Sequence, residues 1–340
     1  MSGSSDGVGP FPKKGGCSVK APWITCRPEI KVLDCTVRDG GLINDHRFDD
    51  ALVKAVYTTC VDAGIDYMEI GYKNARRLFA KDQFGAWKFS DEADIRRIVG
   101  DNPTPLKLSV MMDAGKSDWR TDLLPKKDSV IDLIRVACYI HQIPEAVDMV
   151  KAAADKGYET TCNIMAISTV QEPEIDQALE VLRETPVGTV VVVDSNGALY
   201  AEQVEILVKK YKAALEGTGK EVGIHAHNNL QLGFANTIEA IIHGANRIDA
   251  TMAGMGRGAG NCPMELLLGF LKNPKFNLRP VLKLLQEQFV PLSGQLEWGP
   301  LVQYNISGQL NQHPRAAIAA RAGKDRDNYV EFYDRCIADV

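Results

Sequence analysis

The chain has 340 residues, of which 45% are hydrophobic and 24% are charged, the balance of an ordinary globular enzyme with a buried core. With 39 basic and 44 acidic residues the formal net charge is −5, so nucleic acid and anionic membrane surfaces are poor partners. The eight cysteines form no CxxC pair, and no apolar stretch reaches the roughly 18 residues of a membrane span, so we expect a protein of the reducing cytoplasm.

The amino-terminal segment is rich in Gly, Ser and Pro and lacks the apolar core of a secretory signal. We therefore expect residues 1–29 to form a flexible leader. Residues 30–273 carry regularly alternating strand and helix patterns and form the predicted catalytic domain. Residues 274–340 are too few for a second catalytic domain, and we expect a helical extension that packs over the first domain or over a partner subunit.

Short β-branched runs alternate with amphipathic helical patterns along the predicted catalytic domain. The predicted strands are Lys31–Thr36, Asp66–Tyr72, Lys107–Met112, Val130–Ala137, Thr160–Ile167, Thr189–Asp194, Glu221–His227 and Arg247–Met252. The predicted helices between them include Asp49–Ala63, Ile143–Lys156, Glu172–Glu184, Ala201–Leu215 and Leu230–His243. Apolar residues recur at helical spacing in these segments, as expected for helices that pack on a sheet.

Eight strand–helix units at a spacing of roughly 30 residues fit a closed (β/α)8 barrel, the TIM barrel of the α/β class. A doubly wound open sheet is the alternative fold. Such a sheet usually has a Gly-x-Gly-x-x-Gly turn after its first strand, and no such turn follows Thr36. The closed barrel also explains why polar residues gather at the carboxyl ends of the predicted strands, where TIM-barrel enzymes hold their active sites.

The strongest chemical pattern combines a carboxylate with two imidazoles. Asp39 follows the first predicted strand, and His225 and His227 alternate at the end of the seventh. Residues i and i+2 of a strand point to the same face, so both imidazoles can reach one ion. This donor set suits a divalent Lewis acid, with Mn²⁺ or Mg²⁺ expected first and Zn²⁺, Fe²⁺ or Co²⁺ as alternatives. The opposing interpretation is an ion-paired Asp and two hydrogen-bonded core histidines.

A glycine-rich segment, Gly254–Asn261, follows the eighth predicted strand. Glycine lets the backbone approach a ligand closely and adopts positive φ without strain. We expect this segment to shape the metal pocket, with the amide oxygen of Asn261 as a fourth ligand or as a group that orients the others. A phosphate-binding loop and a simple tight turn are the alternatives.

Three segments together resemble the signatures of the DRE-TIM metallolyase superfamily: Asp-Cys-Thr-Val-Arg-Asp-Gly at 34–40, His-Ala-His-Asn-Asn at 225–229 and Gly-Ala-Gly-Asn at 258–261. This superfamily includes 3-hydroxy-3-methylglutaryl-CoA lyase, isopropylmalate and homocitrate synthases, and 4-hydroxy-2-oxovalerate aldolase. The resemblance runs from about Lys31 to Gly269. Residues 135–137 and 258–263 are most similar to the hydroxy-oxo-acid aldolase branch.

The resemblance implies a role for each residue of these motifs. Asp39, His225 and His227 would hold the divalent ion, and Asn261 would complete the site. Arg38 would place a fixed cation beside the metal and stabilise an enolate. Three further polar residues are predicted to bind substrate: Asn44, Glu69 and Arg135.

The general base is the point at which the sequence departs from the aldolase branch. That branch carries a His base three residues after the Asp of Arg-Asp-Gly, and here the position is Leu42. His313, in the polar segment Asn311–Arg315, is the first choice to replace it, because histidine titrates near neutral pH. The other candidates are Asp45, His46, Tyr304 and, through a Schiff base, Lys73.

The predicted enzyme makes or breaks a carbon–carbon bond next to a small-molecule 2-oxo acid such as pyruvate, through a metal-stabilised enolate. We expect a homodimer or a higher homo-oligomer. The first alternative is an acyl-CoA-dependent Claisen synthase or lyase with the same metal site. The second is a non-catalytic barrel that serves as a scaffold, prompted by Leu42 in place of the expected base.

Overall fold

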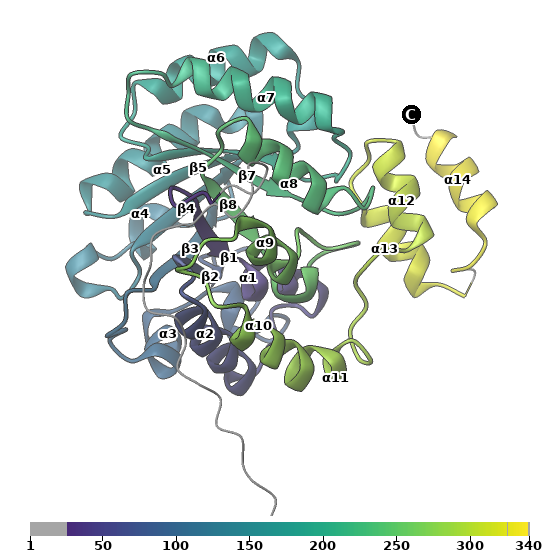
Figure 1. Ribbon diagram of the computed structural model, residues 1–340, viewed down its shortest axis with the longest axis horizontal. Helices are drawn as coiled ribbons and strands as arrows, with labels where there is room; N and C mark the ends of the chain where they lie inside the picture. The colour runs from purple at the N-terminus through teal and green to yellow at the C-terminus, as the bar shows by residue number, and fades with distance from the viewer. Residues whose placement is uncertain (1–25, 325, 339–340) are drawn as a thin grey trace, which may run out of the picture.

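Eight parallel strands close into a barrel in chain order, and β1 pairs with β8 to complete it (Figure 1). This computed structural model describes residues 26–338 apart from residue 325, so most of the predicted leader, 1–29, lies outside the described residues. The predicted (β/α)8 barrel is confirmed. The strands are β1 (Lys31–Asp34), β2 (Tyr67–Tyr72), β3 (Lys107–Asp113), β4 (Leu133–Cys138), β5 (Glu159–Ile164), β6 (Thr189–Asp194), β7 (Glu221–Ala226) and β8 (Arg247–Ala250).

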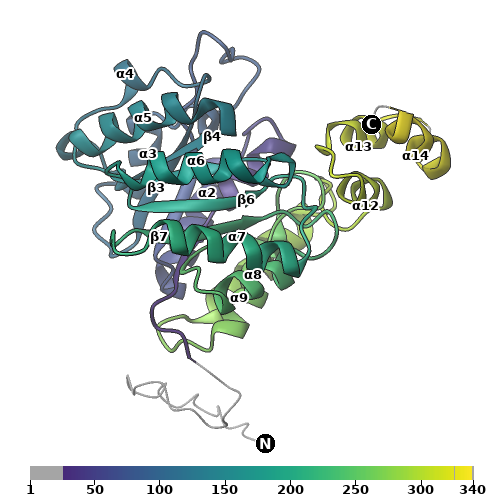
Figure 2. The ribbon, with the colours of Figure 1, turned by 90° about the horizontal axis from the view of Figure 1, so that it is seen from above.

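Helices cover the outside of the barrel (Figures 1 and 2). The long helices that follow strands are α2 (Asp50–Ala63), α3 (Glu92–Val99), α5 (Ile143–Asp155), α6 (Glu172–Arg183), α7 (Ala201–Ala214), α8 (Gly233–Ile242) and α9 (Met264–Leu271). Shorter helices are α1 (Thr36–Gly40) after β1, α4 (Trp119–Asp122) after β3, and α10 (Leu278–Leu284) and α11 (Val290–Leu292) after α9. The five helices predicted from the sequence are all present, with ends that differ by up to three residues.

The local sequence explains these elements. β6 reads Thr-Val-Val-Val-Val-Asp and is buried throughout, as a parallel strand covered on both faces must be. Helix α2 begins where the side chain of Asp49 accepts a hydrogen bond from the Leu52 N–H at 2.8 Å. It ends at Gly64, whose φ of 72° is a left-handed conformation that glycine adopts without strain.

The first strand is shorter than predicted, and this difference positions the site. The prediction Lys31–Thr36 is wrong at its end, because β1 stops at Asp34 and α1 begins at Thr36. The carboxylate of Asp34 accepts hydrogen bonds from the Thr36 hydroxyl at 2.6 Å and the Thr36 N–H at 3.2 Å, which turns the chain. Arg38 and Asp39 therefore lie on a single helical turn over the barrel mouth and not on a strand end.

Three carboxy-terminal helices form a lobe beside the barrel, coloured yellow in Figures 1 and 2. They are α12 (Val302–Gln309), α13 (Arg315–Ala322) and α14 (Tyr329–Ala338). A small hydrophobic cluster, which includes Tyr304 and Phe332 of the lobe, also contains Ala259 of the barrel. The segment 311–314 between α12 and α13 reaches back to the barrel, where Asn311 bonds to Ser168 and Asn196.

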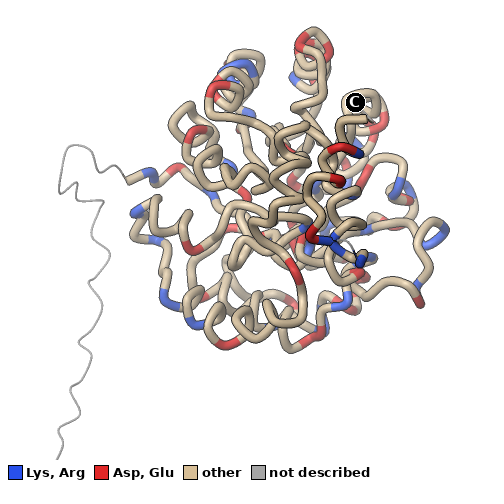
Figure 3. Tube along the Cα trace, turned by 90° about the vertical axis from the view of Figure 1, so that its right-hand side faces the viewer, with Lys and Arg blue, Asp and Glu red and all other residues tan. Residues whose placement is uncertain are grey.

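Charges of both signs are interspersed over the outer helices in the view of Figure 3. Many of them form exposed pairs, such as Arg97 with Asp50 at 2.6 Å between α3 and α2. Exposed pairs of this kind contribute little to stability because water screens them. Among the described helices, none has the length and apolar character that crossing a bilayer demands.

Candidate active site

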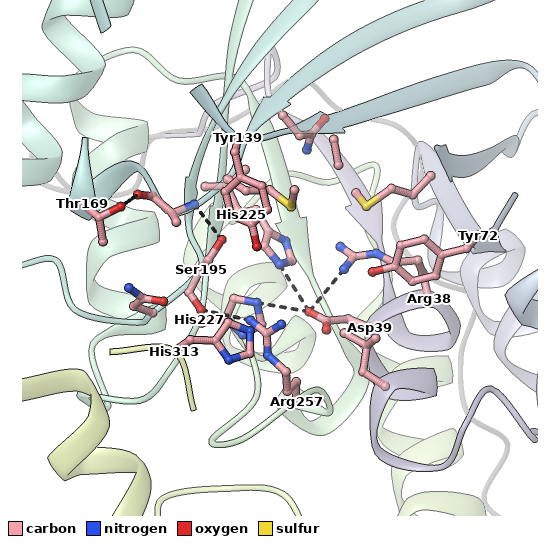
Figure 4. Close-up of a pocket in the computed structure, with 18 of the residues that line it drawn as sticks. Arg38, Asp39, Tyr72, Tyr139, Thr169, Ser195, His225, His227, Arg257 and His313 are labelled. Atoms are coloured by element: carbon pink, nitrogen blue, oxygen red, sulfur yellow. Dashed lines mark hydrogen bonds and ion pairs between the residues drawn. The ribbon is translucent and has the colours of Figure 1, made fainter. Parts of the chain in front are cut away.

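One carboxylate and two imidazoles meet at the carboxyl end of the barrel (Figure 4). Asp39 Oδ2 lies 3.3 Å from Nε2 of His225 and 3.6 Å from Nε2 of His227. The three ligand atoms lie within 4.8 Å of one another, and all three side chains are buried. His225 lies on β7 and His227 just beyond it, where the backbone bridges to that of Asn261. The structure thus brings together the three predicted ligands.

Several buried polar atoms of this cluster have no hydrogen-bond partner within the described chain. They are both carboxylate oxygens of Asp39, Nε2 of His225 and Oδ1 of Asn261. Leaving such atoms unpaired is costly, and a group that accepts electron pairs from all of them would satisfy the cluster. A divalent cation with mixed nitrogen and oxygen ligands fits this donor set.

Asn261 is held beside the cluster by the glycine-rich segment. Its amide Nδ2 donates to the backbone oxygen of Met255 at 3.1 Å, which leaves Oδ1 as the free acceptor. A Cβ at Gly256 would lie 2.1 Å from Asn261 Nδ2 and 3.4 Å from Asp39 Cγ. Glycine is therefore required at position 256, because any side chain would push the amide out of place.

The charges around the cluster keep the carboxylate ionised. Burial opposes ionisation of Asp39, but the guanidinium of Arg38, whose Nη1 lies 3.6 Å from Asp39 Oδ2, is the largest contribution on the other side and favours the charged carboxylate. The pKa of Asp39 is therefore held well below its usual range. Burial lowers the pKa of His227 well below 6.5, so its imidazole is neutral and can donate an electron pair to a metal.

A buried chain of charges supports the ligands from beneath. Nδ1 of His225 lies 3.0 Å from Asp249 Oδ2, and Asp249 also pairs with Nη2 of Arg135. Nη1 of Arg135 lies 3.0 Å from Glu69 Oε2, which also accepts from Nε of Arg38 at 2.7 Å. Asp249 fixes the ring of His225 with Nδ1–H toward the carboxylate, so Nε2 presents its electron pair to the cluster.

We expect the substitution Asp249→Asn to weaken Mn²⁺ binding by about 10- to 100-fold, the usual effect of losing such a carboxylate–imidazole contact. A neutral amide accepts the Nδ1–H bond less strongly and no longer balances Arg135. Titration calorimetry of the metal-free protein measures the affinity. Asp66→Asn is the matched control, because Asp66 bonds to the backbone N–H of Val32 away from the cluster. Unchanged Mn²⁺ affinity in the Asp249 variant would contradict this role.

A cavity of about 290 Å³ opens over the cluster. Its lining comes from the carboxyl-terminal parts of strands β2 to β7, from the loops that follow strands, and from the carboxy-terminal lobe. The residues that line it are Arg38, Asp39, Leu42, Tyr72, Met111, Ala137, Tyr139, Asn163, Met165, Ala166, Thr169, Val193, Ser195, Asn196, His225, His227, Arg257, Asn311 and His313. Its volume lies at the lower end of the range for small-molecule sites, so it suits a compact ligand.

His313 lies in this cavity, as the segment between α12 and α13 carries it over the barrel mouth (Figure 4). Its Nδ1 accepts a hydrogen bond from the backbone N–H of Arg315 at 3.2 Å, so Nε2 is the ring nitrogen that remains to contact a ligand. Burial and the nearby cation Arg257 lower the pKa of His313 to about 3. Its imidazole is therefore neutral at pH 7.

The other candidates for the base lie away from the cavity lining. His46 is buried and packs edge-on against Tyr72, with ring centroids 5.3 Å apart. Tyr304 belongs to the small hydrophobic cluster of the carboxy-terminal lobe and the barrel. Nζ of Lys73 donates to the backbone oxygen of Ser90 at 3.4 Å. Asp45 is exposed in the turn before α2.

Asn44, Glu69 and Arg135, which the sequence predicts to bind substrate, do not line the cavity. The Asn44 side chain accepts the backbone N–H of Arg47 at 3.3 Å and stays in its turn. Glu69 and Arg135 are 0% and 1% exposed and bond to each other beneath the ligands. Glu69 and Arg135 support the cluster from below and are not exposed to the cavity.

Arg257 is a cavity residue that the sequence analysis did not assign to the site. Its Nη2 donates to the backbone oxygen of Ser195 at 3.1 Å, while its buried Nε has no partner within the described chain. Burial lowers its pKa from 12.5, and the guanidinium remains a cation near neutral pH. Its place within the glycine-rich segment was the available signal, because that segment was already predicted to shape the pocket.

Comparisons with known proteins agree with this geometry. The family model described as HMGL-like matches residues 29–286. A 4-hydroxy-2-oxovalerate aldolase of Rhodococcus jostii is 28% identical over 247 residues, 71% of this chain and 70% of that protein. A 4-hydroxy-2-oxovalerate aldolase of Thermus thermophilus is 29% identical over 254 residues, 74% of this chain and 71% of that protein.

Solved structures share the fold. The N-terminal domain of a Bacteroides vulgatus protein, named as an aldolase candidate, superposes with a TM-score of 0.74 at 28% identity, over 91% of this chain and 99% of that one. Hydroxymethylglutaryl-CoA lyase from Pseudomonas aeruginosa superposes with a TM-score of 0.62 at 15% identity, over 78% of this chain and 94% of that one. At that identity the second likeness concerns the fold alone.

Proposed function

Because this chain belongs to the HMGL-like family, we propose that it is a divalent-metal-dependent aldolase that makes or cleaves a carbon–carbon bond adjacent to a 2-oxo acid. The observation that carries the proposal is the convergence of Asp39, His225 and His227 on one point of the cavity. The names of the aldolases to which the chain is 27–29% identical support the same reaction class.

Asp39, His225 and His227 would hold the ion, with the amide oxygen of Asn261 as a further ligand. The ion would be Mn²⁺ or Mg²⁺ first, with Zn²⁺, Fe²⁺ or Co²⁺ as alternatives. When bound, it supplies Lewis acidity that stabilises the negative charge of an enolate.

Two arginines would bind and stabilise the 2-oxo acid. Arg38 is buried and held by Glu69, and its Nη2 has no partner within the described chain. It would donate to the oxygen on which negative charge develops, a preorganised interaction that needs no rearrangement during the reaction. Arg257 would bind the carboxylate of the 2-oxo acid through its unpaired Nε.

His313 would move the proton. In the cleavage direction its imidazole would accept the proton of the substrate 4-hydroxyl as the C3–C4 bond breaks and the hydroxyl-bearing carbon becomes an aldehyde. The electron pair of that bond passes into the enolate of pyruvate, and His313 would then return the proton that it accepted to the enolate carbon, which completes the reaction. In the addition direction the same steps run in reverse.

The pH dependence should reflect the low pKa of His313, about 3. A base with this pKa is neutral, and so able to accept a proton, across pH 5–8. We therefore expect titration of His313 itself to cause no fall in kcat/KM near pH 6.5 at saturating Mn²⁺, in the range in which an unperturbed histidine base would lose activity on acidification. His313→Gln should lower kcat by about 10²- to 10⁴-fold, the usual contribution of a general base.

The matched control for His313→Gln is His243→Gln, since His243 pairs with Glu239 on the outside of the barrel. Steady-state rates from pH 5 to 8 measure both variants. Full activity of the His313 variant would assign proton transfer to another group.

Exchange of the methyl protons of pyruvate in deuterated buffer tests the proposed function. The exchange requires enolate formation but no aldehyde, so it isolates the metal-dependent step. We expect exchange with Mn²⁺ present, its loss after complete chelation and its recovery when Mn²⁺ is restored. Exchange that persists after chelation would refute the metal-dependent mechanism. Absence of exchange in metal-loaded protein would favour the scaffold alternative, and exchange of an acyl-CoA thioester alone would favour the Claisen alternative.

We also propose a reducing cytoplasm and a homo-oligomer for this protein. The thiols of Cys138 and Cys162 lie 3.8 Å apart in the barrel as free cysteines, an arrangement that a reducing compartment preserves, whereas Cys26, before the first strand, is disulfide-bonded. Exposed apolar side chains on one face of α14, including Val330 and Tyr333, supply a surface for self-association. Sedimentation equilibrium measures the oligomeric state.

A further inference from the structure

One side of the cavity carries hydrogen-bonding groups that the steps above do not use. Four side chains, which we call the polar wall, form it: Asn163, Thr169, Ser195 and Asn196. They follow or end strands β5 and β6. In Figure 4, Thr169 and Ser195 lie on one side of His225, and Arg38 and Tyr72 lie on the other.

Two groups of the polar wall have hydrogen atoms to donate. Asn163 is 1% exposed, and its side-chain oxygen accepts the Thr161 hydroxyl at 2.7 Å. Its N–H₂ group is therefore the part left for a molecule in the cavity. Ser195 Oγ accepts the backbone N–H of Ala166 at 2.9 Å, which leaves its own hydroxyl hydrogen to donate.

The other two groups have electron pairs to accept a hydrogen bond. The amide Nδ2 of Asn196 donates to the backbone oxygen and to Oδ1 of Asn311 at 3.0 and 3.1 Å, which leaves the Asn196 carboxamide oxygen. The Thr169 hydroxyl donates to the backbone oxygen of Ala166 at 2.8 Å, which leaves its lone pairs. The polar wall thus presents both donors and acceptors.

Hydroxyl groups match this mixture because each one donates one hydrogen bond and accepts others. A hydrocarbon chain in the same place would strip water from these groups and give no bond in return, which strongly disfavours such a ligand. The apolar lining is a separate cluster of Met111, Ala137 and Tyr72, packed with Leu42 and Met165. It can enclose the methyl or methylene carbon of the 2-oxo acid.

We infer that the aldehyde added to or released from the 2-oxo acid is a short hydroxylated aldehyde, such as an aldose fragment, and not a simple alkanal. The inference rests on the proposed function. In the addition direction the C3 carbon of pyruvate loses a proton to the base and bonds to the aldehyde carbon. The aldehyde oxygen takes a proton and becomes the 4-hydroxyl, while the remaining hydroxyls contact the polar wall.

The test compares aldehydes of equal carbon number as acceptors for pyruvate in the Mn²⁺-loaded enzyme. The pairs are glyceraldehyde with propanal and erythrose with butanal. We expect kcat/KM to be at least about tenfold higher for the hydroxylated member, the effect of roughly one well-formed hydrogen bond (~1.4 kcal/mol). Equal rates, or a preference for the alkanals, would overturn the inference.

The aldehydes also differ in intrinsic reactivity and in hydration. These differences are the same for every form of the enzyme, so they cancel when a variant is compared with wild type. Thr169→Val replaces an exposed hydroxyl with a methyl group. In this variant the ratio of kcat/KM for the hydroxylated aldehyde to kcat/KM for the alkanal should be lower than in wild type by about threefold or more. Thr121→Val is the matched control, because the Thr121 hydroxyl likewise donates to the backbone oxygen three residues earlier, at 3.1 Å, but lies outside the cavity. Its preference should equal that of wild type. A wild-type preference that neither Thr169→Val nor Ser195→Ala reduces would assign selectivity to the aldehydes themselves and overturn the inference.

Pyruvate exchange separates failure of this inference from failure of the proposed function. The exchange uses no aldehyde and does not depend on the polar wall. Wild-type enzyme that exchanges pyruvate protons but shows no preference for hydroxylated aldehydes would keep the proposed function and reject the inference. Wild-type enzyme that fails to exchange pyruvate protons would reject the proposed function itself, and with it the inference.

Discussion

Asp39→Asn is expected to abolish stoichiometric binding of Mn²⁺ and to lower aldol kcat/KM by more than about 100-fold, beyond the usual effect of changes outside the ligands themselves. The reason is that Asp39 contributes the one carboxylate of the cluster, with both oxygens free of hydrogen bonds within the described chain. An amide has no negative charge to balance a divalent ion. Elemental analysis of dialysed protein gives bound metal per chain, and initial rates with saturating pyruvate give activity.

Asp45→Asn serves as the control, because Asp45 is a nearby but exposed carboxylate of the loop that follows α1. It should retain both metal and activity. An Asp39 variant that kept one Mn²⁺ per chain after dialysis would show that the ion binds elsewhere. In that case the functional role proposed for the two histidines would have to be reconsidered.

Arg135→Met is expected to reduce the free energy of unfolding by about 3–5 kcal/mol, as is usual when one partner of a buried ion pair is removed. Arg135 is 1% exposed and lies between Glu69 and Asp249, so its loss leaves two buried carboxylates without that cation. Urea unfolding of metal-free protein, followed by circular dichroism, measures the change in the transition midpoint.

The matched control for Arg135→Met is Arg97→Met. Arg97 also contacts two carboxylates, Asp50 and Asp94, but at the surface, where such pairs contribute about 0–1 kcal/mol. Its transition midpoint should stay close to that of the native chain. Equal loss of stability in both variants would mean that burial of the charges is not what makes Arg135 important.

The barrel and the meeting of the three proposed metal ligands were predictable because they depend on local patterns and on the closure of the barrel. Strand and helix periods alternate throughout residues 30–273, and a closed barrel gathers the carboxyl ends of its strands at one rim. Asp39, His225 and His227 were therefore expected to meet, although their function as ligands stays a prediction. The turn at Asp34 was missed because it is set by a side-chain bond to Thr36 and not by a periodic pattern.

The supporting charges and the cavity lining were harder to predict. Glu69 and Arg135 are polar residues on the predicted strands β2 and β4. The sequence alone does not show whether such residues face a cavity or contact one another. Their 3.0 Å contact beneath the ligands decides this. The position of Ser195 depends on a loop path, and the cavity contact of Asn163 on β5 depends on packing between distant segments. His313 was predicted to lie at the site only because histidines are few and its neighbours are polar.

The contribution of the segment 311–314 to the cavity divides labour between two parts of the molecule. The barrel and its loops hold every group proposed to bind the ion, whereas His313 and Asn311 come from the segment between the lobe helices α12 and α13. The carboxy-terminal lobe can therefore change during evolution while the proposed metal-binding groups of the barrel stay the same. Relatives with a different lobe would still form an enolate but would react it with a different aldehyde.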